Sequence, residues 1–210
     1  SNRGANDFHS PSRPPQPRNL KPKDLIGIPW RVALALQADG WYLRSDIIWA
    51  KPNPMPESVT DRPTKSHEYI FLLTKNHKYY FDNEAIKEPV KEDWGTRDRS
   101  DGKYHNEGSG LQPHTGLEKS YEMANKRSVW TVTTKPFTGA HFAVYPPELI
   151  EPCILAGSRP NDIVLDPFMG SGTTAAVAQR LNRQYLGCEL NTDYKKLQDD
   201  RLKQPSLELL

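Results

Sequence analysis

The run Asp166–Thr174 (DPFMGSGTT) constrains the fold of this chain most strongly, because it directly follows the apolar residues Ile163–Leu165. The pattern predicts a buried strand, a tight glycine turn and then a helix over Ala175–Leu181. A parallel α/β sheet uses such a junction to hold a cofactor, since the backbone can approach a ligand closely where side chains are absent. The run therefore predicts an α/β fold with a ligand site near the end of the chain.

A second predicted strand, Gln184–Glu189, carries a carboxylate at its C-terminal end. In dinucleotide-binding folds, a carboxylate roughly 20 residues beyond the glycine turn binds ribose hydroxyls. The turn and this carboxylate together indicate a cofactor of the adenosine type.

The glycine turn is open to several interpretations. A P-loop requires a lysine after its last glycine, and none follows Gly172, which disfavours triphosphate hydrolysis. A dehydrogenase fingerprint tolerates Ala175 in its last place, but Asp166 would repel a pyrophosphate. The same carboxylate would pair well with the cationic amino group of S-adenosylmethionine. An ordinary strand-to-helix turn without a ligand is the remaining alternative.

The glycine turn, together with Gly187–Asn191 (GCELN), resembles the cofactor motif of DNA methyltransferases that methylate cytosine N4 or adenine N6. Segments 45–56 and 66–75 resemble later strands of the catalytic half of that family, and segment 139–150 resembles the part that precedes the cofactor motif. The resemblance covers most of the chain apart from residues 88–127 and the first 20 residues.

The order of these segments is also informative. The cofactor motif comes last, which resembles the permuted, β-type members of the family. The resemblance implies a Rossmann-like, S-adenosylmethionine-dependent methyltransferase sheet that is circularly permuted and incomplete in this chain. The family's catalytic tetrapeptide, (Asp/Ser/Asn)-Pro-Pro-(Tyr/Phe/Trp), is absent here, because neither Pro14-Pro15 nor Pro146-Pro147 has the required neighbours. We therefore expect no catalytic residue in this chain, and we expect the tetrapeptide upstream of it.

The missing tetrapeptide has a consequence for folding. In the family, its strand lies beside the cofactor strand, so the strands present here would flank a gap. Such a gap leaves backbone groups unpaired at edges that should be interior. We expect these 210 residues to need a missing N-terminal segment or a partner chain, and a homodimer is also possible.

The resemblance also implies the site residues and the partners. The cofactor is S-adenosylmethionine and the substrate is double-stranded DNA. The expected cofactor-binding residues are Asp166, Phe168, Gly170, Ser171, Gly172, Thr173 and Glu189, with His141 and Phe142 at the border of the pocket. The expected DNA-contacting residues are Trp49, Lys51, Asn53, Arg97 and Arg99.

The chain divides into segments of different character. We expect a flexible arm over 1–22, catalytic-side elements over 23–87, a variable target-recognition loop over 88–128, a cofactor-binding half over 129–204 and a tail over 205–210. The local patterns predict helices over Arg31–Ala38 and Pro147–Ala156. They predict strands over Trp41–Trp49, 67–75 and 129–132, with a further strand over Lys78–Asp82 that pairs in a hairpin.

Composition and charge limit the classes of protein to which this chain can belong. The chain has no apolar run approaching the roughly 18 residues of a membrane span and no secretory signal, and its net charge is only +2. Cys153 and Cys188 lie in apolar surroundings, which favours buried free thiols in a reducing compartment over a disulfide. His67 and His141 lack partners at metal-ligand spacing, so we expect no metal.

The resemblance implies a site-specific DNA methyltransferase of the prokaryotic or phage cytoplasm, in a restriction–modification setting, and we expect it to be inactive as this piece alone. The alternative is a non-catalytic, cofactor- or DNA-binding partner subunit. A nucleotide-binding oxidoreductase is a distant third interpretation.

Overall fold

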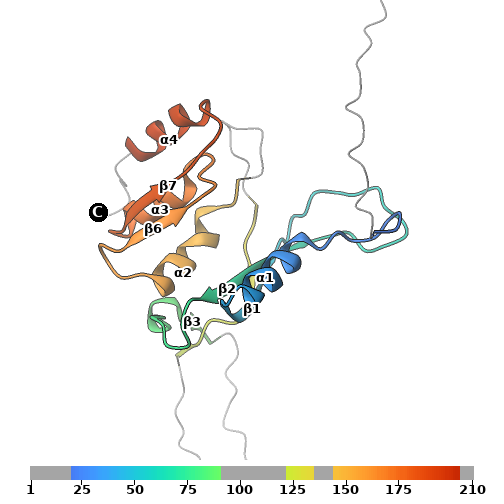
Figure 1. Ribbon diagram of the computed structural model, residues 1–210, viewed down its shortest axis with the longest axis horizontal. Helices are drawn as coiled ribbons and strands as arrows, with labels where there is room; N and C mark the ends of the chain where they lie inside the picture. The colour runs from blue at the N-terminus through green and yellow to red at the C-terminus, as the bar shows by residue number, and fades with distance from the viewer. Residues whose placement is uncertain (1–19, 91–121, 135–143, 204–210) are drawn as a thin grey trace, which may run out of the picture.

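The computed structural model describes residues 20–90, 122–134 and 144–203 (Figure 1). The expectations for residues 1–19 and 204–210, and for Arg97, Arg99, His141 and Phe142, lie outside these ranges.

The described part of the chain contains both helices and strands, as the sequence predicts, and they alternate from α2 (Pro147–Gly157) onward. The helices are α1 (Ile28–Ala38), α2 (Pro147–Gly157), α3 (Thr173–Arg180) and α4 (Tyr194–Lys203), with a short 3-10 turn η1 (Glu84–Ile86). The strands are β1 (Tyr42–Ala50), β2 (His67–Thr74), β3 (Glu88–Pro89), β4 (Met123–Ala124), β5 (Val129–Thr131), β6 (Ile163–Asp166) and β7 (Gln184–Gly187). None of the helices in the described part of the chain is long and apolar enough to cross a membrane.

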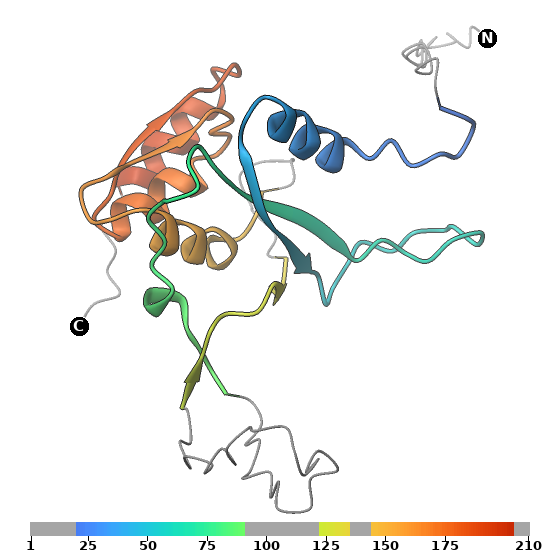
Figure 2. The same ribbon diagram turned by 60° about the horizontal axis from the view of Figure 1, so that its bottom comes forward.

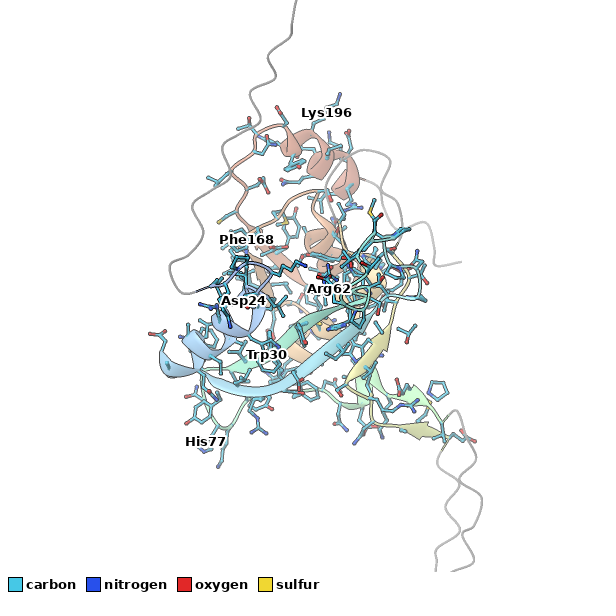
Figure 3. The ribbon with its side chains drawn as sticks, turned by 90° about the vertical axis from the view of Figure 1, so that its right-hand side faces the viewer. Asp24, Trp30, Arg62, His77, Phe168 and Lys196 are labelled. Atoms are coloured by element: carbon cyan, nitrogen blue, oxygen red, sulfur yellow. The ribbon has the colours of Figure 1, made fainter. Side chains whose placement is uncertain are left out.

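The first main sheet has the order β2-β1-β5, with β1 antiparallel to β2 and parallel to β5. The register pairs Trp49 with Trp130, so the two indoles lie on neighbouring strands, where both are buried. They form a core with Leu149 of α2. Helix α1 packs on this sheet through Trp30, whose ring meets the ring of Phe71 edge to face at 4.9 Å between centroids (Figure 3).

The second main sheet consists of β6 and β7, which are parallel and joined through α3. Its core contains Ile154 of α2 with Val177 and Ala178 of α3. Helix α2 therefore contributes Leu149 to one core and Ile154 to the other, and Figure 1 shows it lying between the two sheets. The described strands of the two sheets are not hydrogen-bonded to each other.

The predicted strand over Lys78–Asp82 is wrong, since residues 75–83 form no strand. The reason is that Asp82 has other partners. Its backbone N–H donates to the carbonyl of Ala156 in α2 at 2.9 Å, and its carboxylate accepts from the N–H of Ala85 at 3.1 Å, which caps η1. Short polar side chains commonly compete in this way with strand pairing.

A small antiparallel ribbon formed by β3 and β4 lies at the two ends of the predicted variable segment. Figure 2 shows it projecting away from the main body. Glu88 of β3 accepts a hydrogen bond from Nε of Arg127 at 2.6 Å. Burial opposes ionisation of Glu88, but the hydrogen bond and charge of Arg127 outweigh it and lower the pKa of this carboxyl. The ribbon was not predicted, because two-residue strands carry no periodic signal.

Gly187, the last residue of β7, gives a test of packing at the glycine turn. A Cβ at this position would lie 1.8 Å from Cε of Met169, which is buried. We expect Gly187→Ala to lower the free energy of unfolding by about 1–3 kcal/mol, as overpacking commonly does, measured by denaturant titration. Gly157→Ala is the matched control, because that Cβ would meet nothing within 4 Å. A double variant with Met169→Ala should cost less than the sum of the two single changes, and strict additivity would contradict the proposed contact.

The two cysteines should differ in reactivity. Cys188 is exposed, so the predicted burial of this thiol is wrong, whereas burial raises the pKa of the Cys153 thiol to about 11. With that pKa only about one in a thousand Cys153 thiols is ionised at pH 8, and the thiolate is the reactive form. Iodoacetamide at pH 8, followed by peptide mass spectrometry, should therefore label Cys188 well before Cys153. Equal labelling of both in the native protein would contradict the structure, and denaturant provides the control in which both react.

Candidate functional site

The glycine turn lies at the carboxyl end of β6 and leads into α3. Gly170 has φ +52° and Gly172 has φ +84°, a left-handed conformation that residues with a Cβ rarely adopt. Gly172 is the N-cap of α3, and the helix begins with the buried residues Thr173 and Thr174. The strand, turn and helix predicted from the sequence are confirmed, although the helix begins two residues earlier. The predicted burial of the strand is wrong, because Ile163 and Leu165 are 65% and 60% exposed.

The Asp166 carboxylate accepts three hydrogen bonds at the end of β6. Oδ1 accepts from the N–H of Phe168 at 2.9 Å. Oδ2 accepts from Oγ1 of Thr174 at 2.5 Å and from the hydroxyl of Tyr145 at 3.2 Å. Burial raises the pKa of Tyr145 to about 12; its hydrogen bond with Thr174 opposes this, and the nearby charge of Asp166 adds to it. Tyr145 is therefore a neutral hydrogen-bond donor at neutral pH.

Glu189 lies on the neighbouring strand connection, two residues beyond the end of β7. Its Oε2 accepts from the N–H of Gly170 at 2.7 Å, and its Oε1 accepts from the N–H of Asn191 at 2.8 Å. Because β6 and β7 are parallel neighbours, Asp166 and Glu189 both follow carboxyl ends at the same edge of the sheet. The structure thus brings together the two carboxylates that the sequence singled out.

Helix α4 holds the turn from another side, which the sequence analysis missed. Nε2 of Gln198 donates to the carbonyl of Gly170 at 2.7 Å, and Nη1 of Arg201 donates to Oγ of Ser171 at 3.1 Å and to Oγ1 of Thr173 at 2.7 Å. Burial lowers the pKa of Arg201. Gln198 and Arg201 are three residues apart, a spacing that places two side chains on the same face of a helix. This spacing is the sequence signal that could have linked the two residues.

The turn has two exposed apolar side chains beside it. Phe168 is 86% exposed, and Leu190, which directly follows Glu189, is fully exposed. The sequence analysis did not predict an exposed apolar side chain at Leu190, because an apolar residue after a predicted strand gives no sign of being at the surface.

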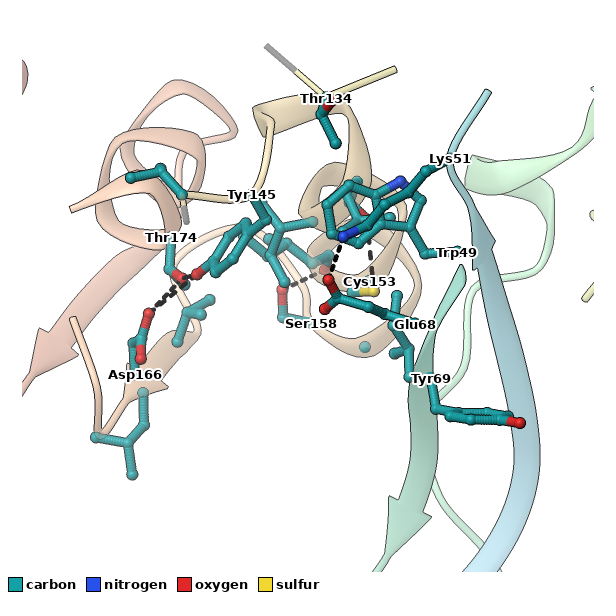
Figure 4. Close-up of a pocket in the computed structure, with 18 of the residues that line it drawn as sticks. Trp49, Lys51, Glu68, Tyr69, Thr134, Tyr145, Cys153, Ser158, Asp166 and Thr174 are labelled. Carbon is teal, nitrogen blue, oxygen red and sulfur yellow. Dashed lines mark hydrogen bonds and ion pairs between the residues drawn. The ribbon is translucent and has the colours of Figure 1, made fainter. Parts of the chain in front are cut away.

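A cavity of about 1210 Å³ lies between the two main sheets (Figure 4). Asp166, Thr174 and Tyr145 lie on its cofactor-motif side, whereas Trp49, Lys51 and Glu68 lie on the opposite side. Helix α2 contributes Cys153 between them. Of the predicted cofactor residues that the structure describes, only Asp166 lines this cavity, together with Trp49, Lys51 and Asn53 of the predicted DNA-contacting set.

The predicted DNA-contacting residues that the structure describes already have partners within the protein. Trp49 is 5% exposed, and its Nε1 donates to the carbonyl of Val132 at 2.8 Å. Lys51 forms an ion pair with Glu68, and its Nζ lies 4.3 Å from the Trp49 ring centroid. Asn53 binds the backbone of Thr134 in both directions, at 3.1 Å as donor and 3.0 Å as acceptor.

The chemistry of the site suits a cationic ligand with an apolar part. Two carboxylates at the carboxyl edge of a parallel pair of strands disfavour a pyrophosphate and favour ammonium and hydroxyl groups. The described residues contain no cluster of histidine, cysteine, aspartate or glutamate that could hold a metal ion.

Comparison with known proteins agrees with this architecture. Residues 5–199 match the N6/N4 DNA methylase family. The Type II methyltransferase M.Cfr9I of Citrobacter freundii is 54% identical over 191 residues, which are 91% of this chain and 54% of that protein. M.SmaI of Serratia marcescens is 53% identical, over 90% of this chain and 56% of that protein. The chain thus spans about half the length of these relatives.

Solved structures show the same fold. The cytosine-N4-specific PvuII DNA methyltransferase aligns over 85% of this chain and 58% of that chain, with a TM-score of 0.61 and 18% identity. The complex of M1.HpyAVI with SAM aligns over 86% of this chain and 72% of that chain, with a TM-score of 0.57 and 24% identity. The predicted α/β methyltransferase fold is confirmed, and the chain belongs to the N6/N4 DNA methylase family.

Proposed function

We propose that this chain is the cofactor-binding part of a site-specific DNA methyltransferase that methylates cytosine N4 or adenine N6 in double-stranded DNA. The observation that carries the proposal is the convergence of Asp166 and Glu189 on one glycine turn at the carboxyl edge of β6 and β7. Membership of the DNA methylase family supports it.

The residues present fit S-adenosylmethionine, which when bound supplies a methyl group on a cationic sulfur. Asp166 would receive the α-ammonium group, with Phe168 and Gly170–Thr173 around the methionine part. Glu189 would bind the ribose hydroxyls. Each Glu189 oxygen accepts one backbone hydrogen bond and has a further lone pair, so it can accept a ribose hydroxyl without releasing the turn. His141 and Phe142 would complete the border of this site.

We assign the DNA contacts to the variable segment and to the end of β1 with the residues that follow it. We propose that residues 88–128 read the target sequence, with Arg97 and Arg99 on phosphates or bases. Trp49, Lys51 and Asn53 would line the approach to the base. Lys51 is paired with Glu68, so a phosphate would have to compete with that carboxylate.

The group that activates the amine would come from residues outside this sequence, since the chain has no (Asp/Ser/Asn)-Pro-Pro-(Tyr/Phe/Trp) tetrapeptide. Among the described strands, β6 pairs only with β7 and β5 pairs only with β1, and the cavity lies between them. We propose that strands from an N-terminal segment, or from a partner chain, fill this cavity. The bacterial relatives and the free cysteines support a cytoplasmic location.

The absence of the tetrapeptide also supports a second candidate, a cofactor- or DNA-binding partner subunit without catalytic activity. The presence or absence of the motif in the complete gene product separates the two. Mass spectrometry of nucleosides from DNA of cells that express the complete gene would identify N4-methylcytosine or N6-methyladenine directly.

The cofactor assignment is tested by calorimetric titration of the complete gene product with S-adenosylhomocysteine and, separately, with NAD. Asp166→Asn should raise the Kd for S-adenosylhomocysteine about 10- to 100-fold, because charge-assisted hydrogen bonds commonly contribute about 1.5–3 kcal/mol. Asp199→Asn, at an exposed position on α4, removes the same charge and should leave the Kd unchanged. Binding of NAD but not of S-adenosylhomocysteine by the unmodified protein would contradict the proposed function.

The assembly proposal is tested with the 210-residue chain by itself, compared with the complete gene product. We expect the isolated chain to self-associate on size exclusion with light scattering, and to lack a cooperative thermal transition in circular dichroism, because open strand edges are adhesive. The complete gene product should melt cooperatively. A monomeric isolated chain with a cooperative melt would contradict the proposal.

A further inference from the structure

Two hydroxyl groups from different elements converge on one oxygen of Asp166. Tyr145 comes from the segment that precedes α2, and Thr174 comes from the first turn of α3. Both contact Oδ2 of Asp166, and the two hydroxyls also form a short hydrogen bond with each other. Figure 4 shows the three side chains pointing toward one another at the edge of the cavity.

The protons in this group can be assigned by counting donors. An ionised Asp166 can only accept, and each hydroxyl has one proton to donate. The Thr174 hydroxyl donates to Oδ2 at 2.5 Å, so the Tyr145 proton goes either to Oγ1 of Thr174 or directly to Oδ2. Both arrangements direct hydrogen bonds toward the carboxylate. The N–H of Phe168 fixes the other oxygen at 2.9 Å, so the plane of the carboxylate is held from two sides.

The hydroxyl of Tyr145 is separable from the packing of its ring. The ring contacts the hydrophobic core that contains Trp49, Trp130 and Leu149, and this contact does not need the hydroxyl. Thr174 is 5% exposed, and valine has the same branched shape without the hydrogen-bonding group. The structure therefore allows each hydrogen bond to be removed while the apolar contacts are retained.

We propose that Tyr145 and Thr174 are positioning residues that hold the Asp166 carboxylate in a fixed orientation for the α-ammonium group of the cofactor. This inference rests on the proposed function and extends it, since it assigns recognition of the amino acid end of the cofactor to a three-residue hydroxyl–carboxylate group. A carboxylate that is already oriented loses less conformational freedom when a cation binds, so binding is tighter.

The test compares two probes in the complete gene product: S-adenosylhomocysteine and its des-amino analogue, which lacks the α-ammonium group. Tyr145→Phe should raise the Kd for S-adenosylhomocysteine about 2- to 10-fold, as expected for the loss of one hydrogen bond. Thr174→Val should have a larger effect, because it removes the direct donor to Asp166. The Kd for the des-amino analogue should stay within about twofold of the unmodified protein in both variants, since that probe has no group for Asp166 to bind.

Two controls accompany these variants. Thr174→Ser retains the hydroxyl and should restore most of the affinity for S-adenosylhomocysteine. Tyr80→Phe removes a phenol whose hydroxyl contacts Asp82, outside the cavity, and should change neither Kd. Melting temperatures of all variants identify any that fail to fold, and Thr174→Ser then provides the comparison.

The outcomes separate the two proposals. If the unmodified protein binds S-adenosylhomocysteine, and Tyr145→Phe and Thr174→Val weaken both probes equally or neither probe, the inference is overturned and the proposed function stands. If the unmodified protein does not bind S-adenosylhomocysteine, the proposed function itself fails. A selective loss for the probe that carries the ammonium group supports the inference.

Discussion

The backbone of Gly170 is held at both of its polar groups by side chains from different parts of the chain. Its N–H donates to Glu189 at the end of β7, and its carbonyl accepts from Gln198 of α4. A left-handed glycine turn is intrinsically free to adopt other conformations, so these two bonds restrict the turn to one. The position of α3 depends on that restriction, and so does the hydrogen bond that the Thr174 hydroxyl of this helix donates to Asp166. The conformation of the glycine turn therefore depends on tertiary contacts as well as on its local sequence.

Helix α2 holds the two main sheets in position relative to each other. It contributes Leu149 to the core of one sheet and Ile154 to the core of the other, while the sheets themselves share no hydrogen bonds among the described strands. The relative placement of the cofactor-motif side and the Trp49 side of the cavity therefore depends largely on side-chain packing against a single helix. Packing of this kind transmits shifts readily, because protein interiors are close-packed.

The sequence predicted those features that depend on neighbouring residues. The strand, turn and helix around Asp166 were predictable because apolar runs and paired glycines are local signals. The hydrogen bonds from Gln198 and Arg201 were not, since they connect α4 to a turn about thirty residues earlier, and one sequence contains no record of such proximity. The predicted strand over Lys78–Asp82 failed for a similar reason, because the bond from Asp82 to Ala156 depends on tertiary structure. Trp49 is an intermediate case: its burial is usual for a strand tryptophan, but its contact with the cavity required the fold.

The ribbon of β3 and β4 brings Glu88 and Ala124 opposite each other, so that the chain leaves and rejoins the folded body at nearly the same point. A segment inserted between two such fixed ends can be lengthened cheaply, since doubling a loop costs only about 0.6 kcal/mol of closure entropy. Its sequence can also be exchanged without a change in the register of β1, β2 or β5. Because the ribbon fixes both ends of the intervening sequence, we expect changes in its length to leave the glycine turn with Asp166 and Glu189 in place.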